Sequence, residues 1–86
     1  MRKSFNRENI GNVRGGPGVY KLYEKNAKKP TYIGETNNLP RRLMEHKNAE
    51  RYHSFEVEHT ASHGEAIRKE KRLIRRHESR RNIAYA

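Results

Sequence analysis

Hydrophobic and polar positions follow a strand-like pattern in three short stretches of the chain, which predicts three strands. Residues 18–24 are rich in valine, leucine and tyrosine, a composition typical of a strand. Residues 31–34 form a second such stretch after the basic turn at 26–30, so the two stretches are expected to pair as a hairpin. Residues 53–60 alternate apolar and acidic side chains, which indicates a half-buried strand.

Two further stretches carry the signals of helices. Asn38 offers a capping side chain, a proline two residues later suits the first helical turn, and the helix is expected to continue to about residue 47. Ser62 and Glu65 have the spacing of a capping box, and a long helix is predicted from there to about residue 77.

The order of these elements predicts the fold class. A β-β-α-β-α order on 86 residues indicates one α+β domain over residues 1–86, with a small three-stranded antiparallel sheet flanked by helices. Residues 1–16 are polar and end in a turn rich in glycine. They are therefore expected to be an N-terminal extension or a short helical piece.

The charge balance narrows the class of partner. Lys and Arg number 20 against 10 Asp and Glu, a formal net charge of +10 that attracts polyanions. Nucleic acid is the leading candidate and an anionic membrane surface is the second. No apolar run approaches the ~20 residues that span a bilayer.

Cysteine is absent, which excludes disulfides and thiolate metal sites. The basic N-terminus is not followed by the apolar stretch of a secretory signal. A cytoplasmic protein is expected, associated with the nucleoid if the source is prokaryotic.

Basic side chains crowd the last predicted helix and recur near the predicted hairpin. We expect seven of them to contact the DNA backbone: Lys21, Arg41, Arg68, Lys69, Arg72, Arg75 and Arg76. The alternative is an ordinary solvated helix face. No zinc finger, helix-turn-helix or RNA-binding signature is present, so base-specific recognition is not expected.

Glu70 interrupts an apolar stripe of the last helix. At 100° per residue it falls between the stripe's members Ala66, Ile67, Leu73 and Ile74. A carboxylate there is desolvated as the helix docks, which is unfavourable unless a cation compensates. The cation is either an arginine in a structural ion pair or a hard metal such as Mg²⁺ or Mn²⁺, and the residues alone leave both open.

A zinc site of His63, Glu70 and His77 fails on distance. Seven residues of helix rise about 10.5 Å, whereas zinc–ligand bonds are near 2 Å.

Arg42 and His46 lie one helical turn apart on the first predicted helix, beside the leucines that face the core. Both side chains are expected at the rim where the helix meets the sheet. Taken alone they are better explained as two solvated polar residues, and Tyr20 and Tyr32 as half-buried strand residues.

Together these residues resemble the signature of the GIY-YIG nuclease superfamily, over residues 17–82. Gly18-Val19-Tyr20 and Tyr32-Ile33-Gly34 match the paired tripeptides, with Val19 as a common variant of the usual isoleucine. Three downstream segments follow in family order: Asn38 to His46, Glu65 to Ile74, and Asn82. The chain is similar to a small single-domain member, and to the N-terminal incision domain of excision-repair nucleases.

The resemblance implies a metal-dependent hydrolysis of DNA phosphodiester bonds. Glu70 would bind one divalent cation, Mg²⁺ or Mn²⁺. Five residues would form the rest of the catalytic centre: Tyr20 to activate water, Tyr32 to hold nucleophile or phosphate, Arg42 to stabilise phosphate charge, His46 to assist either, and Asn82 to brace the site. Gly18 and Gly34 would be structural at the site.

Physical chemistry adds an expectation about Tyr20. A tyrosine with a pKa near 10 is a poor base at neutral pH, and a nearby cation such as Arg42 or the metal would favour the phenolate. Two residues depart from the family's pattern: Glu35 stands where related repair nucleases often carry lysine, and Arg81 precedes Asn82 where many members have an aromatic residue.

These features favour a DNA endonuclease that recognises DNA structure or, weakly, sequence. The alternatives are a catalytically silent basic module that binds nucleic acid, and a nuclease subunit of a larger repair, restriction or recombination assembly. The expected partner is duplex or branched DNA, and a homodimer is possible.

Overall fold

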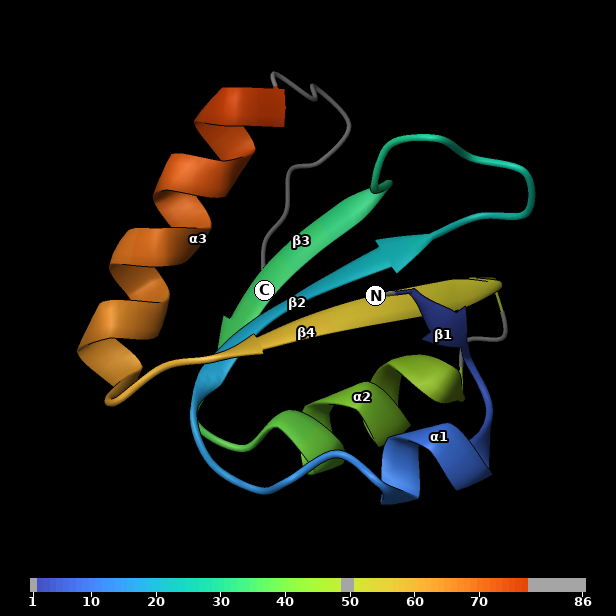
Figure 1. Cartoon of the computed structure of the whole chain (residues 1–86), viewed down its shortest axis with the longest axis horizontal. Helices are drawn as coiled ribbons and strands as arrows, with labels where there is room; N and C mark the ends of the chain where they lie inside the picture. Colours follow the sequence, from blue (N-terminus) through green and yellow to red (C-terminus); the bar gives the residue numbers. More distant parts are fainter. Residues whose placement is uncertain (1, 49–50, 78–86) are drawn as a thin grey trace.

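The computed structural model describes residues 2–48 and 51–77, in which a twisted sheet separates two layers of helix (Figure 1). The four strands lie in the order β1-β4-β2-β3, and every neighbouring pair is antiparallel. In chain order the elements are β1 (Lys3–Ser4), α1 (Arg7–Gly11), β2 (Gly18–Tyr23), β3 (Tyr32–Thr36), α2 (Leu39–Lys47), β4 (Ser54–His59) and α3 (His63–His77).

The predicted α+β class and hairpin are confirmed, but the expectation of three strands is one strand short. β1 pairs with the start of β4, placing Lys3 opposite Phe55. It is two residues long and exposed on both sides, so it leaves no periodic pattern in the sequence. The short helix allowed for in residues 1–16 is α1, where the Asn6 side chain caps the helix by accepting a hydrogen bond from Asn9 N at 2.8 Å.

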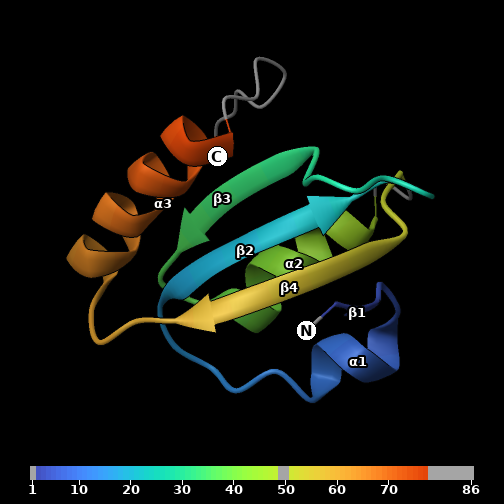
Figure 2. The same ribbon diagram turned by 45° about the horizontal axis from the view of Figure 1, so that its top comes forward.

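Helices α1 and α2 cover one face of the sheet, and α3 covers the other (Figure 2). On the α2 face, Tyr20, Leu22 and Phe55 pack with the core residues of α1 and α2. On the α3 face, Val19 and Ile33 pack against Ala66 and Leu73 of α3. Because side chains alternate along a strand, neighbouring residues of β2 and β3 reach opposite layers.

Local signals fix where both long helices begin. The Asn38 side chain accepts from Arg41 N at 3.3 Å and caps α2 as expected. Ser62 Oγ accepts from Glu65 N at 3.2 Å, while the Glu65 carboxylate accepts from Ala61 N at 2.8 Å, one residue earlier than in a standard capping box. Every helix in the described part of the chain is too short or too polar to cross a membrane.

Candidate active site

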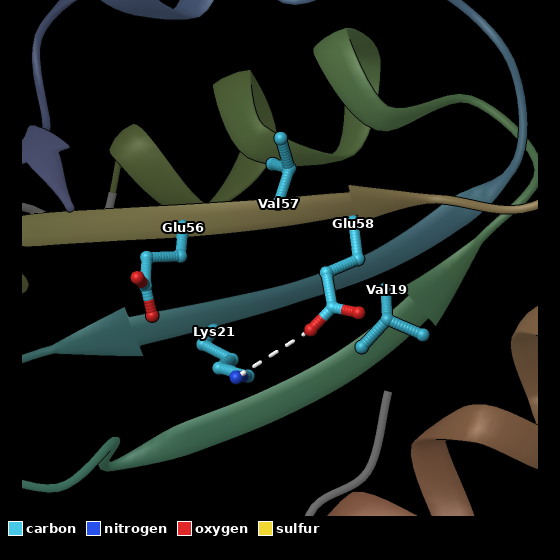
Figure 3. Close-up of a pocket in the computed structure, with 5 residues that line it drawn as sticks. All are labelled: Val19, Lys21, Glu56, Val57 and Glu58. Atoms are coloured by element: carbon cyan, nitrogen blue, oxygen red, sulfur yellow. Dashed lines mark ion pairs between the residues drawn. The ribbon is translucent and has the colours of Figure 1, made fainter. Parts of the chain in front are cut away.

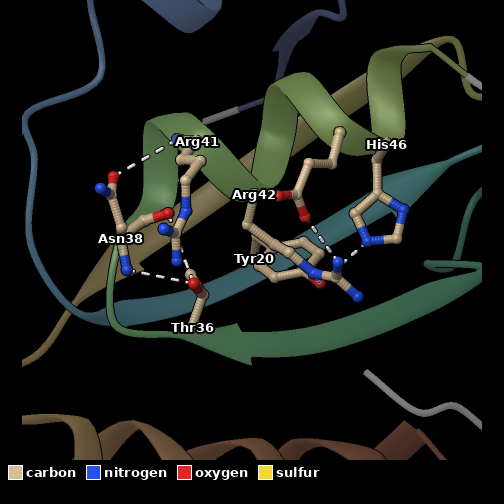
Figure 4. A network of polar contacts seen from close by, with 7 residues as sticks. Tyr20, Thr36, Asn38, Arg41, Arg42 and His46 are labelled. Atoms are coloured by element: carbon tan, nitrogen blue, oxygen red, sulfur yellow. Dashed lines mark hydrogen bonds and ion pairs between the residues drawn. The ribbon is translucent and has the colours of Figure 1, made fainter.

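Tyr20 is the centre of a polar cluster buried under α2 (Figure 4). Its side chain has no exposed surface, its hydroxyl lies 3.0 Å from His46 Nε2, and Arg42 Nε donates to the hydroxyl oxygen at 3.3 Å. Arg42 and His46 are one turn apart on α2, and the buried residues Leu39 and Leu43 hold the helix against the sheet. The predicted position of both polar side chains at the helix–sheet rim is confirmed.

The hydrogen bonds offer a path for proton transfer from Tyr20. The Tyr20 oxygen accepts from Arg42 Nε, and in the tautomer protonated on Nδ1 the His46 Nε2 accepts the phenolic hydrogen. Burial, and then the charge of Arg42, lower the pKa of His46, so its imidazole is neutral at neutral pH. In that tautomer an unprotonated imidazole nitrogen lies 3.0 Å from the Tyr20 hydroxyl and can accept its proton.

The expected effect of Arg42 on the pKa of Tyr20 is confirmed in direction, but burial outweighs it. Arg42 does lower the pKa of Tyr20, but burial raises it more, and Tyr32 raises it further, so the net shift is upward. Desolvation disfavours the phenolate in a site with no exposed surface. Tyr20 is thus a phenol at neutral pH, and it can act as a base only by passing its proton to a partner such as His46.

Aromatic rings enclose this proton path. The rings of Tyr20 and Tyr32 stack with centroids 5.9 Å apart, and Tyr32 lies 4.8 Å from the His46 ring. Tyr52 completes the enclosure at 6.3 Å from His46 and was missed by sequence reasoning. It lies between α2 and β4 without a motif around it, so only the folded chain reveals its position.

Gly34 makes room for Tyr20. The two residues are directly opposite each other in the β2–β3 pair, and a Cβ on Gly34 would occupy the space of the Tyr20 phenol. Gly18 is restricted in the same way, because a Cβ there would lie 2.7 Å from Leu39 Cδ1. Both glycines therefore have a structural role: the absence of a side chain leaves the space that Tyr20 and Leu39 occupy.

Gly34→Ala is expected to lower the stability of the fold by about 1–3 kcal/mol, the usual effect of overpacking a tight core. Gly64→Ala is the matched control, since nothing lies closer than 3.8 Å to a Cβ there. Alanine in that exposed helical position should leave stability unchanged or raise it by roughly 0.5–1 kcal/mol. Chemical denaturation of both variants checks this, and equal midpoints for the two would contradict the packing argument.

Arg42 joins the buried cluster to the solvent. Its Nη1 bonds Glu45 Oε1 at 2.7 Å, and hydrogen bonds to Glu45 and then Tyr20 raise the pKa of Arg42, so the guanidinium is charged. Arg42 also lines an open hollow at the end of β3, together with Glu35, Thr36, Asn37 and His63. A charged guanidinium facing solvent in this way is suited to a phosphate.

Glu70 projects from α3 as a half-buried carboxylate. Burial, and then the charge of Glu35, raise the pKa of Glu70, while Lys71 lowers it by less. Within residues 2–48 and 51–77 no salt bridge joins Glu70 to a basic side chain, so the ion-pair explanation finds no support there. A divalent cation would relieve both unfavourable effects, and oxygen donors are its preferred ligands.

In the described residues, no group of three or more histidine and acidic side chains is arranged to hold a metal ion. The donor set around Glu70 therefore fits a cation held mainly by one carboxylate and solvent, the manner in which Mg²⁺ is often bound.

Comparison with known proteins agrees with this geometry. The family model of the GIY-YIG catalytic domain matches residues 16–83. The chain belongs to the GIY-YIG family. GIY-YIG catalytic domains are endonuclease domains, which means that they hydrolyse phosphodiester bonds.

Two relatives make the family assignment more specific. The UvrABC system protein C of Methylococcus capsulatus is 35% identical, in a match that covers 86% of this chain but only 14% of that relative's length. The GIY-YIG N-terminal endonuclease domain of UvrC from Thermotoga maritima, solved with its catalytic magnesium, superposes with a TM-score of 0.74. It is 27% identical and covers 90% of this chain and 94% of that one. A variant of the same domain bound to its catalytic divalent cation is 25% identical, with a TM-score of 0.74.

The chain is therefore a GIY-YIG endonuclease domain that is similar to the N-terminal domain of UvrC. Of its predicted site residues, the structure brings Tyr20, Tyr32, Arg42 and His46 together and places Glu70 on the helix that packs against β3. Asn82 lies outside the described residues, as does Arg81.

Two of the predicted DNA contacts in this GIY-YIG domain have partners within the chain. Glu58 binds Lys69 at 2.6 Å. It also binds Lys21 at 3.6 Å, the ion pair that Figure 3 shows. The Lys21 side chain is only 18% exposed. The other five predicted contacts are exposed, and within the described part of the chain none of them forms a salt bridge. They are Arg41, Arg68, Arg72, Arg75 and Arg76.

Proposed function

We propose that this GIY-YIG domain is a divalent-metal-dependent DNA endonuclease that recognises DNA structure or, weakly, sequence. The observation that carries the proposal is the buried Tyr20 hydroxyl, held between the Arg42 guanidinium and a neutral His46. A phenol with a proton acceptor on one side and a phosphate-binding cation on the other is suited to activating water beside a phosphodiester.

Each residue has a defined task in this mechanism. His46 takes the phenolic proton, so Tyr20 can accept a proton from the attacking water. Arg42 keeps its Nε on Tyr20 and its Nη1 on Glu45, and its remaining N–H groups stabilise the charge that develops on the phosphate. Glu70 would hold the cation, which when bound supplies positive charge to the phosphate and makes water more acidic.

The proposed substrate is DNA, on two grounds. The Thermotoga maritima neighbour is an endonuclease domain of UvrC. In addition, five exposed arginines, four on α3 and one on α2, form no salt bridge within the described residues and give the chain positive charge that can meet phosphates. A panel of linear, flapped and four-way-junction DNAs, with Mg²⁺ or Mn²⁺, tests the proposal. Cleavage of one or more panel members is expected. DNA binding without cleavage of any of them would instead identify a silent binding module.

DNA affinity is expected to depend steeply on salt and little on sequence. If the five exposed arginines each neutralise one phosphate, log K should fall with log salt at a slope of about −4 to −5. Arg72→Ala should reduce the steepness by about one. Lys21→Ala is the matched control and should leave the slope unchanged, because Glu58 already occupies Lys21. A flat salt response, or equal effects of the two substitutions, would contradict this assignment of the surface.

The rate of cleavage should fall on the acid side of neutrality. The pKa of His46 is lowered from its ordinary value of 6.5, so the imidazole stays neutral until the pH drops below that value and then loses its ability to accept the Tyr20 proton. Single-turnover rates in buffers from about pH 5 to 8 check this expectation. Raising the Mg²⁺ concentration separates the groups, because metal competes with protons at Glu70 but not at His46. An acid limb above 6.5 would argue against His46 as the acceptor.

A further inference from the structure

The proposed function leaves Glu35 and His63 without a task, although they form a close pair. Glu35 follows Gly34 in β3, His63 is the first residue of α3, and His63 Nε2 is hydrogen-bonded to Glu35 Oε1. The Glu35 side chain is 21% exposed and that of His63 is 45% exposed, so the carboxylate is the more enclosed partner. This arrangement fixes the orientation of the imidazole and leaves its other nitrogen for solvent or a ligand.

The pair lies in the same hollow as Arg42. Arg42 from α2 and His63 from α3 both line it, and Glu35, Thr36 and Asn37 supply the floor from the end of β3 and the turn after it. A phosphodiester bound by the Arg42 guanidinium would therefore lie beside the His63 imidazole. Among the described residues that line this hollow, the charged groups beside His63 are Arg42 of α2 and Glu35 of β3.

The pair and the Tyr20–His46 base lie on opposite sides of β3, the edge strand of the sheet. Tyr20 packs over Gly34 on the α2 face, and Glu35 follows directly, so its side chain alternates toward the α3 face. Arg42 connects the two sides, because it bonds Tyr20 and lines the hollow. A phosphate held by Arg42 would thus have the Tyr20–His46 base on one side of the strand and His63 on the other.

Hydrolysis of a phosphodiester requires two proton transfers. One removes a proton from the attacking water, and the other delivers a proton to the oxygen that leaves phosphorus. The mechanism proposed above accounts only for the first.

We propose that His63, oriented by Glu35, is the general acid that protonates the leaving oxygen. The water oxygen forms the new P–O bond and loses its proton toward Tyr20 and His46. The electron pair of the breaking P–O bond stays on the leaving oxygen, which takes the N–H proton of the His63 imidazolium. Glu35 balances the positive charge of His63 before the transfer. This inference rests on the proposed endonuclease function.

A substrate with sulfur in place of the leaving oxygen tests the step. A thiolate leaves without protonation far more readily than an alkoxide, because thiols have pKa values near 8.5 and water near 15.7. On ordinary DNA, His63→Gln should lower the single-turnover rate by about 100-fold or more, the usual contribution of a general acid. On the sulfur-substituted DNA it should cleave within about threefold of wild type, since no proton is needed there.

Three further variants test whether rescue by sulfur is specific to the His63–Glu35 pair. Mn²⁺ is used throughout because it binds sulfur as well as oxygen. Glu35→Gln should show a smaller loss that the sulfur substrate also rescues. Tyr20→Phe should stay slow on both substrates. His59 lies at the end of β4 and its ring bonds the Arg14 carbonyl. His59→Gln is therefore the matched control and should match wild type on both substrates.

Two results would overturn the assignment: His63→Gln within about threefold of wild type on ordinary DNA, or equally slow on both substrates. A Glu35→Gln variant that is equally slow on both substrates would also overturn the assignment. This variant therefore tests the proposal even if His63→Gln is too unstable to assay. Absence of cleavage by wild type on any substrate would overturn the endonuclease function itself and with it the role of His63.

Discussion

Glu70→Gln is expected to lower DNA cleavage by about 1000-fold or more, which corresponds to roughly 4 kcal/mol of transition-state stabilisation. Glutamine keeps the size of the side chain but removes the charge that would hold a divalent cation. DNA affinity should change by less than about threefold, because the arginines that bind phosphate are untouched. Calorimetric titration with Mn²⁺ should show binding by wild type and its loss in the variant.

The same substitution should not weaken the fold. The pKa of Glu70 is raised in the folded state, so its ionisation opposes folding at neutral pH, and stability contributed by the neutral form is lost as the pH rises above 4.5. In EDTA, Glu70→Gln should therefore melt at or above the temperature of wild type. Glu58→Gln is the matched control on the same sheet face, and it should retain both Mn²⁺ binding and cleavage. Full cleavage by Glu70→Gln, or a melting temperature far below wild type, would contradict these roles.

Tyr20→Phe is expected to abolish cleavage almost completely while leaving the chain folded. Phenylalanine preserves the ring that packs over Gly34 but removes the only atom of this residue that can exchange a proton. The Arg42 and His46 contacts are lost, at a net cost of about 1 kcal/mol, or several degrees of melting temperature for a domain of this size. Single-turnover cleavage and thermal melts of the same preparations measure the two effects.

Tyr23→Phe supplies the control. Tyr23 is also a buried tyrosine with a hydrogen-bonded hydroxyl, which donates to Glu56 Oε1 at 2.6 Å, and burial raises the pKa of Tyr23 to about 12. It lies on the α3 face of the sheet, away from Arg42 and His46. Its loss should lower stability by a similar amount without slowing cleavage. If Tyr20→Phe cleaves within about tenfold of wild type, a difference of roughly 1.4 kcal/mol, Tyr20 is not the base.

Local patterns carried the parts of the fold that the sequence could predict. The β2–β3 hairpin, the caps of α2 and α3 and the apolar stripe interrupted by Glu70 all depend on residues close together in the chain. Arg42 and His46 could be placed at the rim because helical spacing fixes which residues share a face. The pairing of Tyr20 with Gly34 then follows from the hairpin register.

Features that depend on distant contacts could not be predicted in this way. β1 exists because two exposed residues pair with residues of β4 that lie fifty or more positions later in the chain. The upward shift of the Tyr20 pKa reflects complete burial under α2, which outweighs the nearby arginine. The pairing of His63 with Glu35 depends on how α3 crosses β3, so the departure from the family's pattern at Glu35 acquires a meaning only in the folded chain.

The most direct measurement of the central claim uses the best DNA substrate of the panel under single-turnover conditions. Wild type, Glu70→Gln and Tyr20→Phe are purified in parallel and assayed with Mg²⁺, with EDTA, and with Mg²⁺ restored after EDTA. The account predicts cleavage by wild type alone, its disappearance in EDTA and its recovery when Mg²⁺ returns. Cleavage that persists in EDTA, or equally in either variant, would contradict a metal-dependent nuclease centred on Tyr20 and Glu70.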